Sequence, residues 1–149
     1  ANMSNQKLRL QQIDKETIAY VEMLLDENTL PLDDIESDRN RIYIGYDDDV
    51  RVGIGGIEMY GTDGLLRSVV IERPARGNRY GTALCEALES KAKADGVQRL
   101  YLLTTTAAEF FKNLGYVEIE RTTAPDTIQQ TTEFDKLCPT TATCMKKSL

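Results

Sequence analysis

The sequence contains no histidine, and its three cysteines, Cys85, Cys138 and Cys144, form no CxxC pair. Without an imidazole the protein cannot use a histidine base, and zinc sites are built mainly from Cys and His. An odd number of cysteines without scaffold-like spacing indicates reduced thiols rather than a disulfide framework. We therefore expect no metal site and a cytoplasmic location.

The chain also lacks a long apolar run and an opening signal-peptide pattern. A membrane span needs roughly 18 or more consecutive apolar residues, so no membrane association is expected. Lys and Arg number 18 against 24 Asp and Glu, which gives a net charge of −6. This balance argues against a nucleic-acid surface.

What the chain does have is the composition of one globular domain. It holds 149 residues, of which 41% are hydrophobic and 28% charged, enough for a single core over residues 3–149. A homodimer is left open. Four arginines, Arg67, Arg73, Arg76 and Arg79, stand close together in this acidic chain. Such a local cluster favours a small anionic ligand over a polyanion.

Hydrophobic periodicity predicts hairpins first and strand–helix alternation later. Asp14 is expected to cap the first helix, and glycines at Gly53, Gly55 and Gly56 indicate a bulge or a close approach within a strand. The strand at 65–71 and the strand at 100–104 are expected to run parallel across a helix. This order predicts an α+β fold, a mixed and mostly antiparallel sheet between helices. The expected strands cover 7–13, 41–46, 51–60, 65–71, 100–104, 116–119 and 142–146, and the expected helices 14–28, 80–95 and 107–114.

The turn Arg76-Gly77-Asn78-Arg79-Tyr80-Gly81 lies between that strand and the helix at 80–95. Backbone N–H groups at the first turn of a helix have no intrahelical partner, and the helix dipole adds partial positive charge there. A short basic turn in this position is an anion site, suited to a phosphate or pyrophosphate.

The run Ser68–Ile71 followed by this turn and Thr82-Ala83-Leu84 resembles motif A of the GCN5-related N-acetyltransferases (GNAT family). The later run FFKNLGY, residues 110–116, resembles the short helix that follows motif A in that family. The order of elements is similar too. The resemblance implies acetyl transfer from acetyl-CoA, the co-substrate, to a small amine.

A narrower resemblance covers the second half of the chain. LYLLTTTAAEFFKNLGY, with the spaced residues Arg121, Pro125, Phe134, Cys138 and Cys144 that follow, is similar to the arsenic-resistance N-acetyltransferase-like subgroup. Cys144 lies in an expected strand and is predicted to be a core residue, so we expect no metalloid site.

The resemblance also assigns the residues that bind acetyl-CoA. Main-chain groups of Val69 and Ile71 would pair with the pantetheine arm, backbone N–H groups of residues 77–82 would hold the pyrophosphate, and the Arg76 side chain would add positive charge. The expected cofactor-binding residues are Val69, Val70, Ile71, Arg76, Gly77, Asn78, Arg79, Tyr80, Gly81 and Thr82.

Two positions depart from the family pattern. Arg79 stands where the family most often has glycine, so this position must accept a side chain. Phe111 stands where many members have the tyrosine that protonates the departing thiolate. Tyr116 occupies the usual core aromatic position, and the proton donor is therefore unassigned.

Amide formation from a thioester needs a neutral amine and a donor for the oxyanion. We assign the donor to the backbone N–H of Ile71. Since histidine is absent, a carboxylate is the expected base. Glu58, which interrupts an apolar strand, is the first candidate and Glu72 the second; either could instead be an exposed strand residue.

The site for the acceptor amine is indicated by single residues rather than by a motif. Arg67 is unusual in an apolar strand, and a guanidinium facing the cleft would bind a substrate carboxylate, which suggests an amino-acid-like amine. Thr104 and Thr105 could line the cleft floor, whereas Thr106 is expected to cap the next helix in a box with Glu109. The insertion at 125–137 is expected to narrow the groove. Two alternatives stay open: acetylation of a protein or peptide, and a non-catalytic acyl-CoA sensor.

Overall fold

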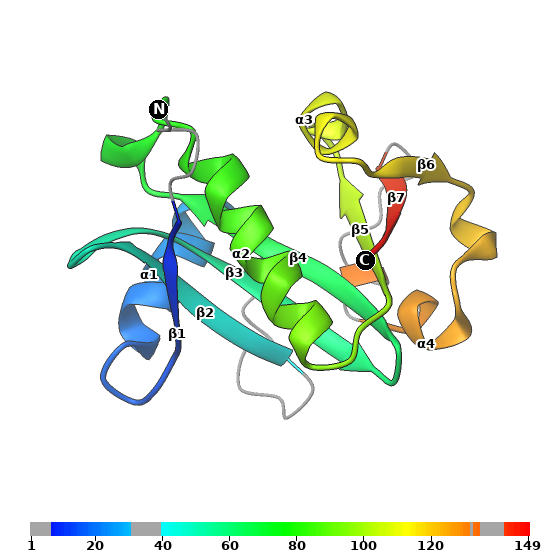
Figure 1. The fold of residues 1–149 in the computed structure, drawn as a ribbon, viewed down its shortest axis with the longest axis horizontal. Helices are drawn as coiled ribbons and strands as arrows, with labels where there is room; N and C mark the ends of the chain where they lie inside the picture. Colours follow the sequence, from blue (N-terminus) through cyan, green and yellow to red (C-terminus); the bar gives the residue numbers. More distant parts are fainter. Residues whose placement is uncertain (1–6, 31–39, 132, 135–141) are drawn as a thin grey trace.

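The computed structural model describes residues 7–30, 40–131, 133–134 and 142–149, and it forms a seven-stranded sheet between helices (Figure 1). The order of strands is β1-β2-β3-β4-β5-β7-β6. All pairs are antiparallel except β4 with β5, which are parallel. The predicted α+β fold and the predicted parallel pair are both confirmed. The strands are β1 (Arg9–Gln12), β2 (Asn40–Asp47), β3 (Val50–Tyr60), β4 (Asp63–Ile71), β5 (Arg99–Thr104), β6 (Val117–Ile119) and β7 (Thr143–Ser148).

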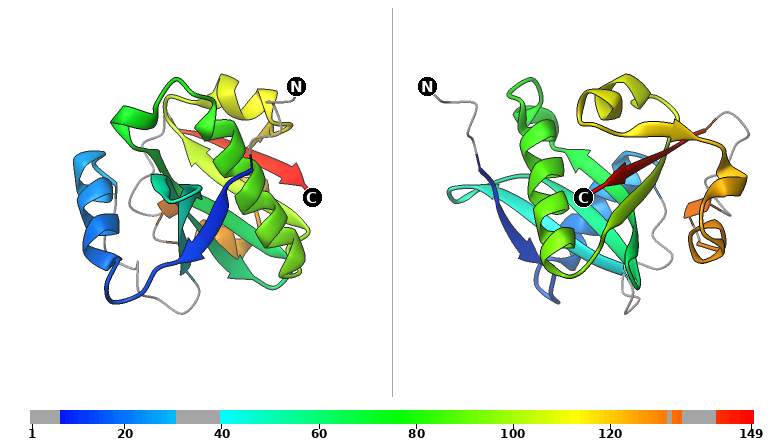
Figure 2. Two further views of the ribbon diagram at one scale, coloured as in Figure 1. Left: turned by 60° about the vertical axis from the view of Figure 1, so that its left-hand side comes forward. Right: turned by 45° about the vertical axis from the view of Figure 1, so that its right-hand side comes forward.

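Helices cover both faces of this sheet, as two turned views show (Figure 2). Helix α1 (Ile18–Glu27) packs Val21, Leu24 and Leu25 against Ile42 and Ile54 of one face. Helix α2 (Tyr80–Ala94) packs Leu84 and Leu88 against the other face. Helices α3 (Ala108–Asn113) and α4 (Asp126–Gln129) are shorter. Among the described residues, no helix has both the length and the apolar character that a membrane crossing requires.

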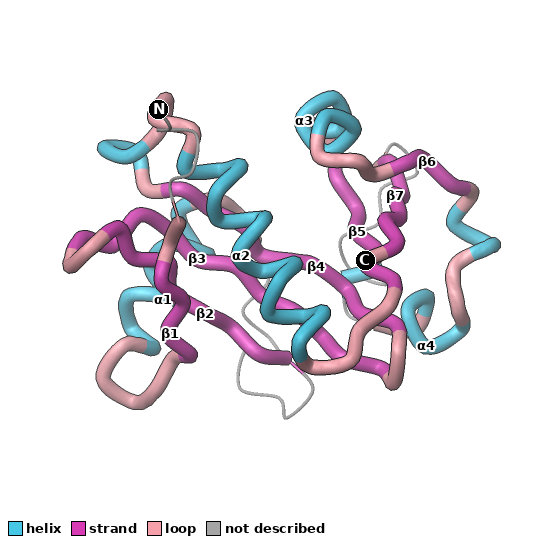
Figure 3. The backbone as a smooth tube through the Cα atoms, in the orientation of Figure 1, coloured by secondary structure: helices cyan, strands magenta, loops and turns pink. Residues whose placement is uncertain are grey.

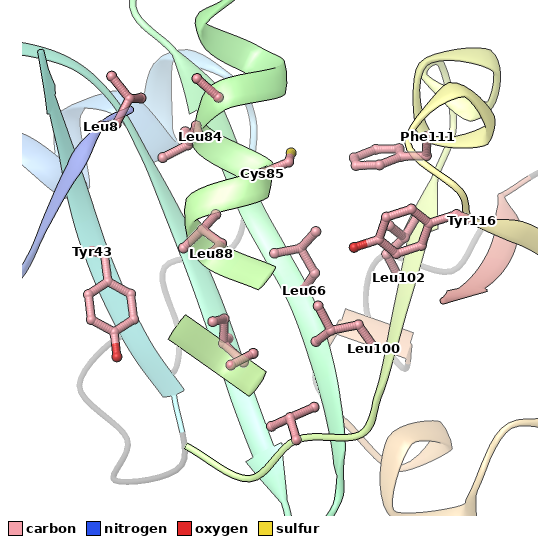
Figure 4. Close-up of a cluster of buried hydrophobic side chains, with 14 of the residues drawn as sticks. Leu8, Tyr43, Leu66, Leu84, Cys85, Leu88, Leu100, Leu102, Phe111 and Tyr116 are labelled. Atoms are coloured by element: carbon pink, nitrogen blue, oxygen red, sulfur yellow. The ribbon is translucent and has the colours of Figure 1, made fainter. Parts of the chain in front are cut away.

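The main core lies between α2, the sheet and α3 (Figure 4). Cys85 of α2, Leu66 of β4 and Leu102 of β5 converge there with Phe111 and Tyr116. Cys85 is fully buried, and burial raises the pKa of its thiol to about 12, with Glu89 adding to the shift. The predicted role of Cys85 as a small core residue is confirmed.

Glycine in β3 allows two close approaches. A Cβ on Gly53 would lie 2.2 Å from the carbonyl oxygen of Val70, and one on Gly55 would lie 2.4 Å from Leu88 Cδ1. The pairing of β3 with β4 is also interrupted by a bulge between Ile54 and Gly56. Both expectations for these glycines, a bulge and a close approach, are confirmed.

Of the two predicted helix caps, one is confirmed and the other is wrong. The regular part of helix α1 begins at Ile18. Asp14 caps the turn that leads into it, because its carboxylate accepts N–H bonds from Glu16 at 2.9 Å and Thr17 at 3.1 Å and its carbonyl oxygen accepts the Ile18 N–H at 3.0 Å. Helix α3 is approached in the same way, because Thr104 Oγ1 accepts the Ala107 N–H at 3.0 Å and replaces the expected Thr106 cap.

Candidate functional site

Strands β4 and β5 pair at one end only, which opens the sheet at its centre (Figure 3). Residues Asp63–Leu65 of β4 pair in parallel with Arg99–Tyr101 of β5. Beyond these residues the two strands are no longer paired. A pocket of about 700 Å³ lies there. Its walls include β4 residues 66–69 and 71, β5 residues 102–104, and Phe110 and Phe111 of α3.

A second pocket of about 240 Å³ joins the first at the N-terminus of α2. Its walls include Gly77, Arg79, Tyr80 and Thr82 from the predicted anion-binding turn. The two pockets share Ile71, Arg76, Gly81 and Phe110. The structure thus joins the turn and the open edge of β4 in one continuous hollow.

Ile71 presents its main chain to this hollow. The Glu72 N–H bonds to Val52 O at 2.9 Å, and Ile71 lies opposite Gly53. Because successive residues of a strand alternate in direction, the N–H and C=O of Ile71 point away from β3, toward the gap. The carbonyl accepts a bond from Arg76 Nε at 2.9 Å, so this arginine braces the strand edge as well as lining both pockets.

The turn before α2 is shaped by left-handed backbone. Gly77 has φ +86°, and Arg79 has φ 65° and ψ 14°. The departure from the family pattern at Arg79 therefore places a side chain on a conformation that glycine adopts without strain. The Tyr80 hydroxyl donates to Asp47 and ties α2 to the β2–β3 hairpin.

Two predicted cofactor residues do not line either pocket. Val70 is buried on the opposite face of the sheet, against α1. Asn78 is exposed, and its side chain donates to Ala75 O at 3.2 Å within the turn. Of the ten residues predicted to bind the cofactor, the other eight lie on the walls: Val69, Ile71, Arg76, Gly77, Arg79, Tyr80, Gly81 and Thr82.

The two predicted bases also lie away from the pocket walls. Glu58 is buried and forms an ion pair with Arg67, and it accepts a bond from the Tyr60 hydroxyl. The exposed fractions of the two paired side chains are 0% for Arg67 and 4% for Glu58. Glu72 accepts a bond from the Tyr20 hydroxyl of α1. Burial, aided by this bond, raises the pKa of Tyr20 above its usual value.

The predicted acceptor residues Arg67, Thr104 and Thr105 all line the larger pocket. Its described walls include one carboxylate that the sequence analysis missed, Glu133, which is 5% exposed. The neighbouring backbone is held by Thr131, whose Oγ1 accepts the Phe134 N–H at 3.3 Å and donates to Ile128 O at 2.7 Å. The only sequence signal for Glu133 was an acidic residue beside an aromatic residue within the insertion.

The aromatic residues of α3 supply no acid. Phe111 packs edge-on against Phe110 and Tyr116, with ring centroids 5.0 and 5.5 Å apart. Tyr116 is buried in the main core rather than on a pocket wall, and its burial near Glu89 raises the pKa of its hydroxyl. The predicted core position of Tyr116 is confirmed.

The two remaining cysteines are Cys138 and Cys144. Cys144 is buried in a core with Leu65 and Phe134, as expected, and Cys138 lies outside the described residues. Within the described ranges, no group of three or more His, Cys, Asp or Glu is placed to hold a metal ion.

Comparison with known proteins gives the site its context. N-alpha-acetyltransferase 80 of Mus musculus is 44% identical over 52 residues, which are 35% of this chain and 17% of the mouse protein. N-acetylglutamate synthase from Neisseria gonorrhoeae, crystallised with coenzyme A and N-acetyl-glutamate, superposes with a TM-score of 0.78 at 18% identity. The superposition covers 95% of this chain and 35% of that one, so this chain spans a minor part of both relatives.

Another solved structure is similar to this chain over nearly its whole length. Rv2747 from Mycobacterium tuberculosis, crystallised with CoA, superposes with a TM-score of 0.76 at 20% identity over 95% of this chain and 99% of that one. At these identities the likeness establishes the fold. The sequence profile of the Acetyltransferase (GNAT) family matches residues 9–116, well over half of the chain. The chain therefore belongs to the acetyltransferase (GNAT) family, and the enzyme class predicted from its sequence, an acyltransferase, is confirmed.

Proposed function

We propose that this protein transfers the acetyl group of acetyl-CoA to a primary amine of a small molecule. The observation that carries the proposal is the continuous hollow between the turn at the start of α2 and the open edge of β4. Three of the superposed proteins, two of them described above and an acetyltransferase from Bacillus subtilis, were crystallised with CoA. That record supports the same co-substrate here.

In this proposal the donor lies along the hollow from the turn before α2 to the larger pocket. Backbone N–H groups of residues 77–82 at the positive end of α2 would hold the pyrophosphate. The amide-rich pantetheine arm would pair with the main chain of Val69 and Ile71, as an added strand pairs with a sheet edge. The acetyl group would then lie in the larger pocket, with the Ile71 N–H as an oxyanion donor.

Within this proposal we reassign the role of the base. Glu58 and Glu72 are held by Arg67 and Tyr20 and lie off the pocket walls, whereas Glu133 lies on them. A base has to reach the proton that it removes. We therefore propose that Glu133 is the base that removes a proton from the ammonium group of the acceptor.

An amino-acid-like acceptor, recognised through Arg67, stays a prediction. The Neisseria synthase binds N-acetyl-glutamate, which supports that class. In this chain the charge of Arg67 is already matched by Glu58. An amino acid and its decarboxylated amine, compared as substrates, test the idea, because carboxylate recognition requires a clear preference for the amino acid.

Three finer predictions from the sequence also remain predictions. They are the arsenic-resistance-like subgroup, the cytoplasmic location and a homodimer. The buried position of Cys144 gives the subgroup likeness no metalloid chemistry among the described residues.

The decisive experiment measures CoA thiol release from acetyl-CoA across a panel of amines, amino acids and peptides. Turnover with small amines supports the proposal. Turnover with peptides alone would favour the protein acetyltransferase, a class suggested by the partial match to N-alpha-acetyltransferase 80. Tight acetyl-CoA binding without turnover on any member would favour the sensor.

A further inference from the structure

Ser68 has an unusual backbone on the wall of the larger pocket. It is 5% exposed and has φ 58°, in the left-handed region that non-glycine residues seldom adopt. The strand register explains this backbone: Ile54 faces Val70 and Gly56 faces Arg67, so Gly55 alone stands opposite Ser68 and Val69. Ser68 is thus part of a β-bulge, a device that redirects a side chain. Strained backbone of this kind is concentrated at functional sites.

The hydrogen bonding of Ser68 fixes which way its hydroxyl can act. Arg67 Nε donates to Ser68 Oγ across 3.2 Å. A guanidinium has donors and no acceptor, so Oγ must accept this bond and its own hydrogen is left for another acceptor. Within the ranges that the structure describes, that hydrogen meets no acceptor. Because Ser68 lines the larger pocket, a ligand bound there can accept this hydrogen.

The group behind Ser68 is itself held in place. Arg67 pairs with Glu58, and Glu58 accepts a bond from Tyr60. These contacts orient the guanidinium so that its Nε–H donates to the Ser68 oxygen. A hydroxyl whose oxygen accepts a hydrogen bond from an ionised group is polarised and becomes a stronger donor itself.

We propose that the Ser68 hydroxyl is an oxyanion donor, which donates a hydrogen bond to the carbonyl oxygen of the thioester in the larger pocket. This inference rests on the proposed function. A donor molecule that runs from the α2 turn along Ile71 and Val69 brings its acetyl end to Ser68, the next residue along β4 that lines the pocket. Arg67 is then a positioning residue.

The acetyl transfer needs no proton from Ser68, which donates a hydrogen bond and keeps its hydrogen. After Glu133 removes one proton from the acceptor's ammonium, the neutral amine forms a bond to the carbonyl carbon and the C=O electron pair moves to oxygen. The Ser68 hydroxyl donates a hydrogen bond to that oxygen. When the C–S bond breaks, the C=O bond re-forms and the thiolate leaves and takes a proton from solvent. The nitrogen releases its second proton to water, which gives the neutral amide.

The test compares Ser68→Ala and Ser68→Gly with the wild type in the thiol-release assay, with each amine that the wild type acetylates as probe. Ser90→Ala, on the exposed side of α2, is the control. Loss of one oxyanion donor lowers kcat by about 10²–10³-fold, while the KM for acetyl-CoA stays within about threefold because the interaction belongs to the transition state. Ser68→Gly also relieves the positive φ, so it should melt no lower than Ser68→Ala while it loses as much activity.

A double variant tests the positioning role of Arg67. If Arg67 acts through Ser68, Arg67→Lys lowers kcat in the wild type but adds little to Ser68→Ala. Wild-type kcat in both folded Ser68 variants overturns the inference, even though acetyl transfer itself is intact. Absence of acetyl transfer by the wild type to every amine overturns the proposed function, and the Ser68 inference with it.

Discussion

Removal of Arg67 should destabilise the protein far more than removal of an exposed arginine. In Arg67→Met the carboxylate of Glu58 stays buried, 4% exposed, without its opposite charge. Breaking a buried ion pair from one side costs about 3–5 kcal/mol, because the remaining charge is neither hydrated nor matched. That is a large part of the roughly 5–15 kcal/mol by which a domain is stable.

The expected shift is large enough for a simple thermal melt. For a domain of about 150 residues, each kcal/mol changes Tm by roughly 2–4 °C. Arg67→Met should therefore lower Tm by roughly 6–20 °C. The measurement is the melting curve followed by circular dichroism, with urea unfolding as a second measure of the free energy.

The exposed pair between Arg41 and Asp95 is the matched control. Its atoms are 3.3 Å apart, but the Arg41 side chain is 44% exposed. An exposed pair is worth about 0–1 kcal/mol because water screens it, so Arg41→Met should leave Tm nearly unchanged. The double variant Glu58→Gln/Arg67→Met removes the orphaned charge and should regain about 2 kcal/mol of the loss. If Arg67→Met costs no more than Arg41→Met, or if the double variant is worse than the single one, this account of the pair is wrong.

Three further predictions concern Arg79, which precedes α2, and the buried cysteines. Arg79→Gly should raise the free energy of unfolding by about 0.5–1 kcal/mol, since glycine removes the left-handed strain at φ 65° but adds entropy to the unfolded chain; a lower Tm would contradict this. In a Cys138→Ser background, a disulfide reagent at pH 8 should not modify native Cys85 or Cys144, which are buried, and should modify both in urea. The raised pKa of Cys85 has a second consequence: its burial favours the thiol, so its contribution to stability is full below the unfolded value of 9.0 and is lost as pH rises through about 12. Unfolding measured across that interval should show stability falling with pH, and less steeply in Cys85→Ala.

The fold and the donor side were predictable because their signals are local. Alternation in β2, β3 and β4 and helical spacing in α2 come from which face each residue buries. The anion-binding turn combines Gly77, which needs a positive φ, with the free N–H groups at the start of a helix. Each of these properties depends on a few consecutive residues.

The Glu58–Arg67 pair was not predicted, although the sequence carried its signal. A hairpin turn at residues 61–62 places Tyr60 opposite Asp63, and counting back brings Gly56 opposite Arg67. Glu58, two residues along, is then the diagonal neighbour on the same face. Each charge was assigned alone to a substrate or to a base, whereas the hairpin register brings the two together.

The bulge and Glu133 depend on contacts that no local pattern encodes. The φ of Ser68 follows from the pairing of β3 with β4 around Gly55, which is small because Leu88 of α2 lies above it. Glu133 reaches the pocket because Ile128 and Phe134 anchor the insertion in a core with Leu65. Such placements are decided by tertiary packing after the elements have formed.

Because the donor site depends on local sequence and Glu133 on tertiary packing, we predict that a substitution can change acceptor chemistry without changing donor binding. The family match ends at residue 116 and includes every wall of the donor site, whereas Glu133 lies beyond it. Glu133→Gln keeps the shape of the side chain but cannot remove a proton, so kcat/KM for the amine should fall by about 10²–10⁴-fold. Acetyl-CoA affinity, measured by calorimetry, should not change, because the donor is held by β4 and α2. Glu118→Gln, on exposed β6, is the control. If Glu133→Gln weakens acetyl-CoA binding as much as turnover, or leaves turnover intact, then Glu133 is not the base and acceptor chemistry must be assigned to the walls formed by β4 and β5.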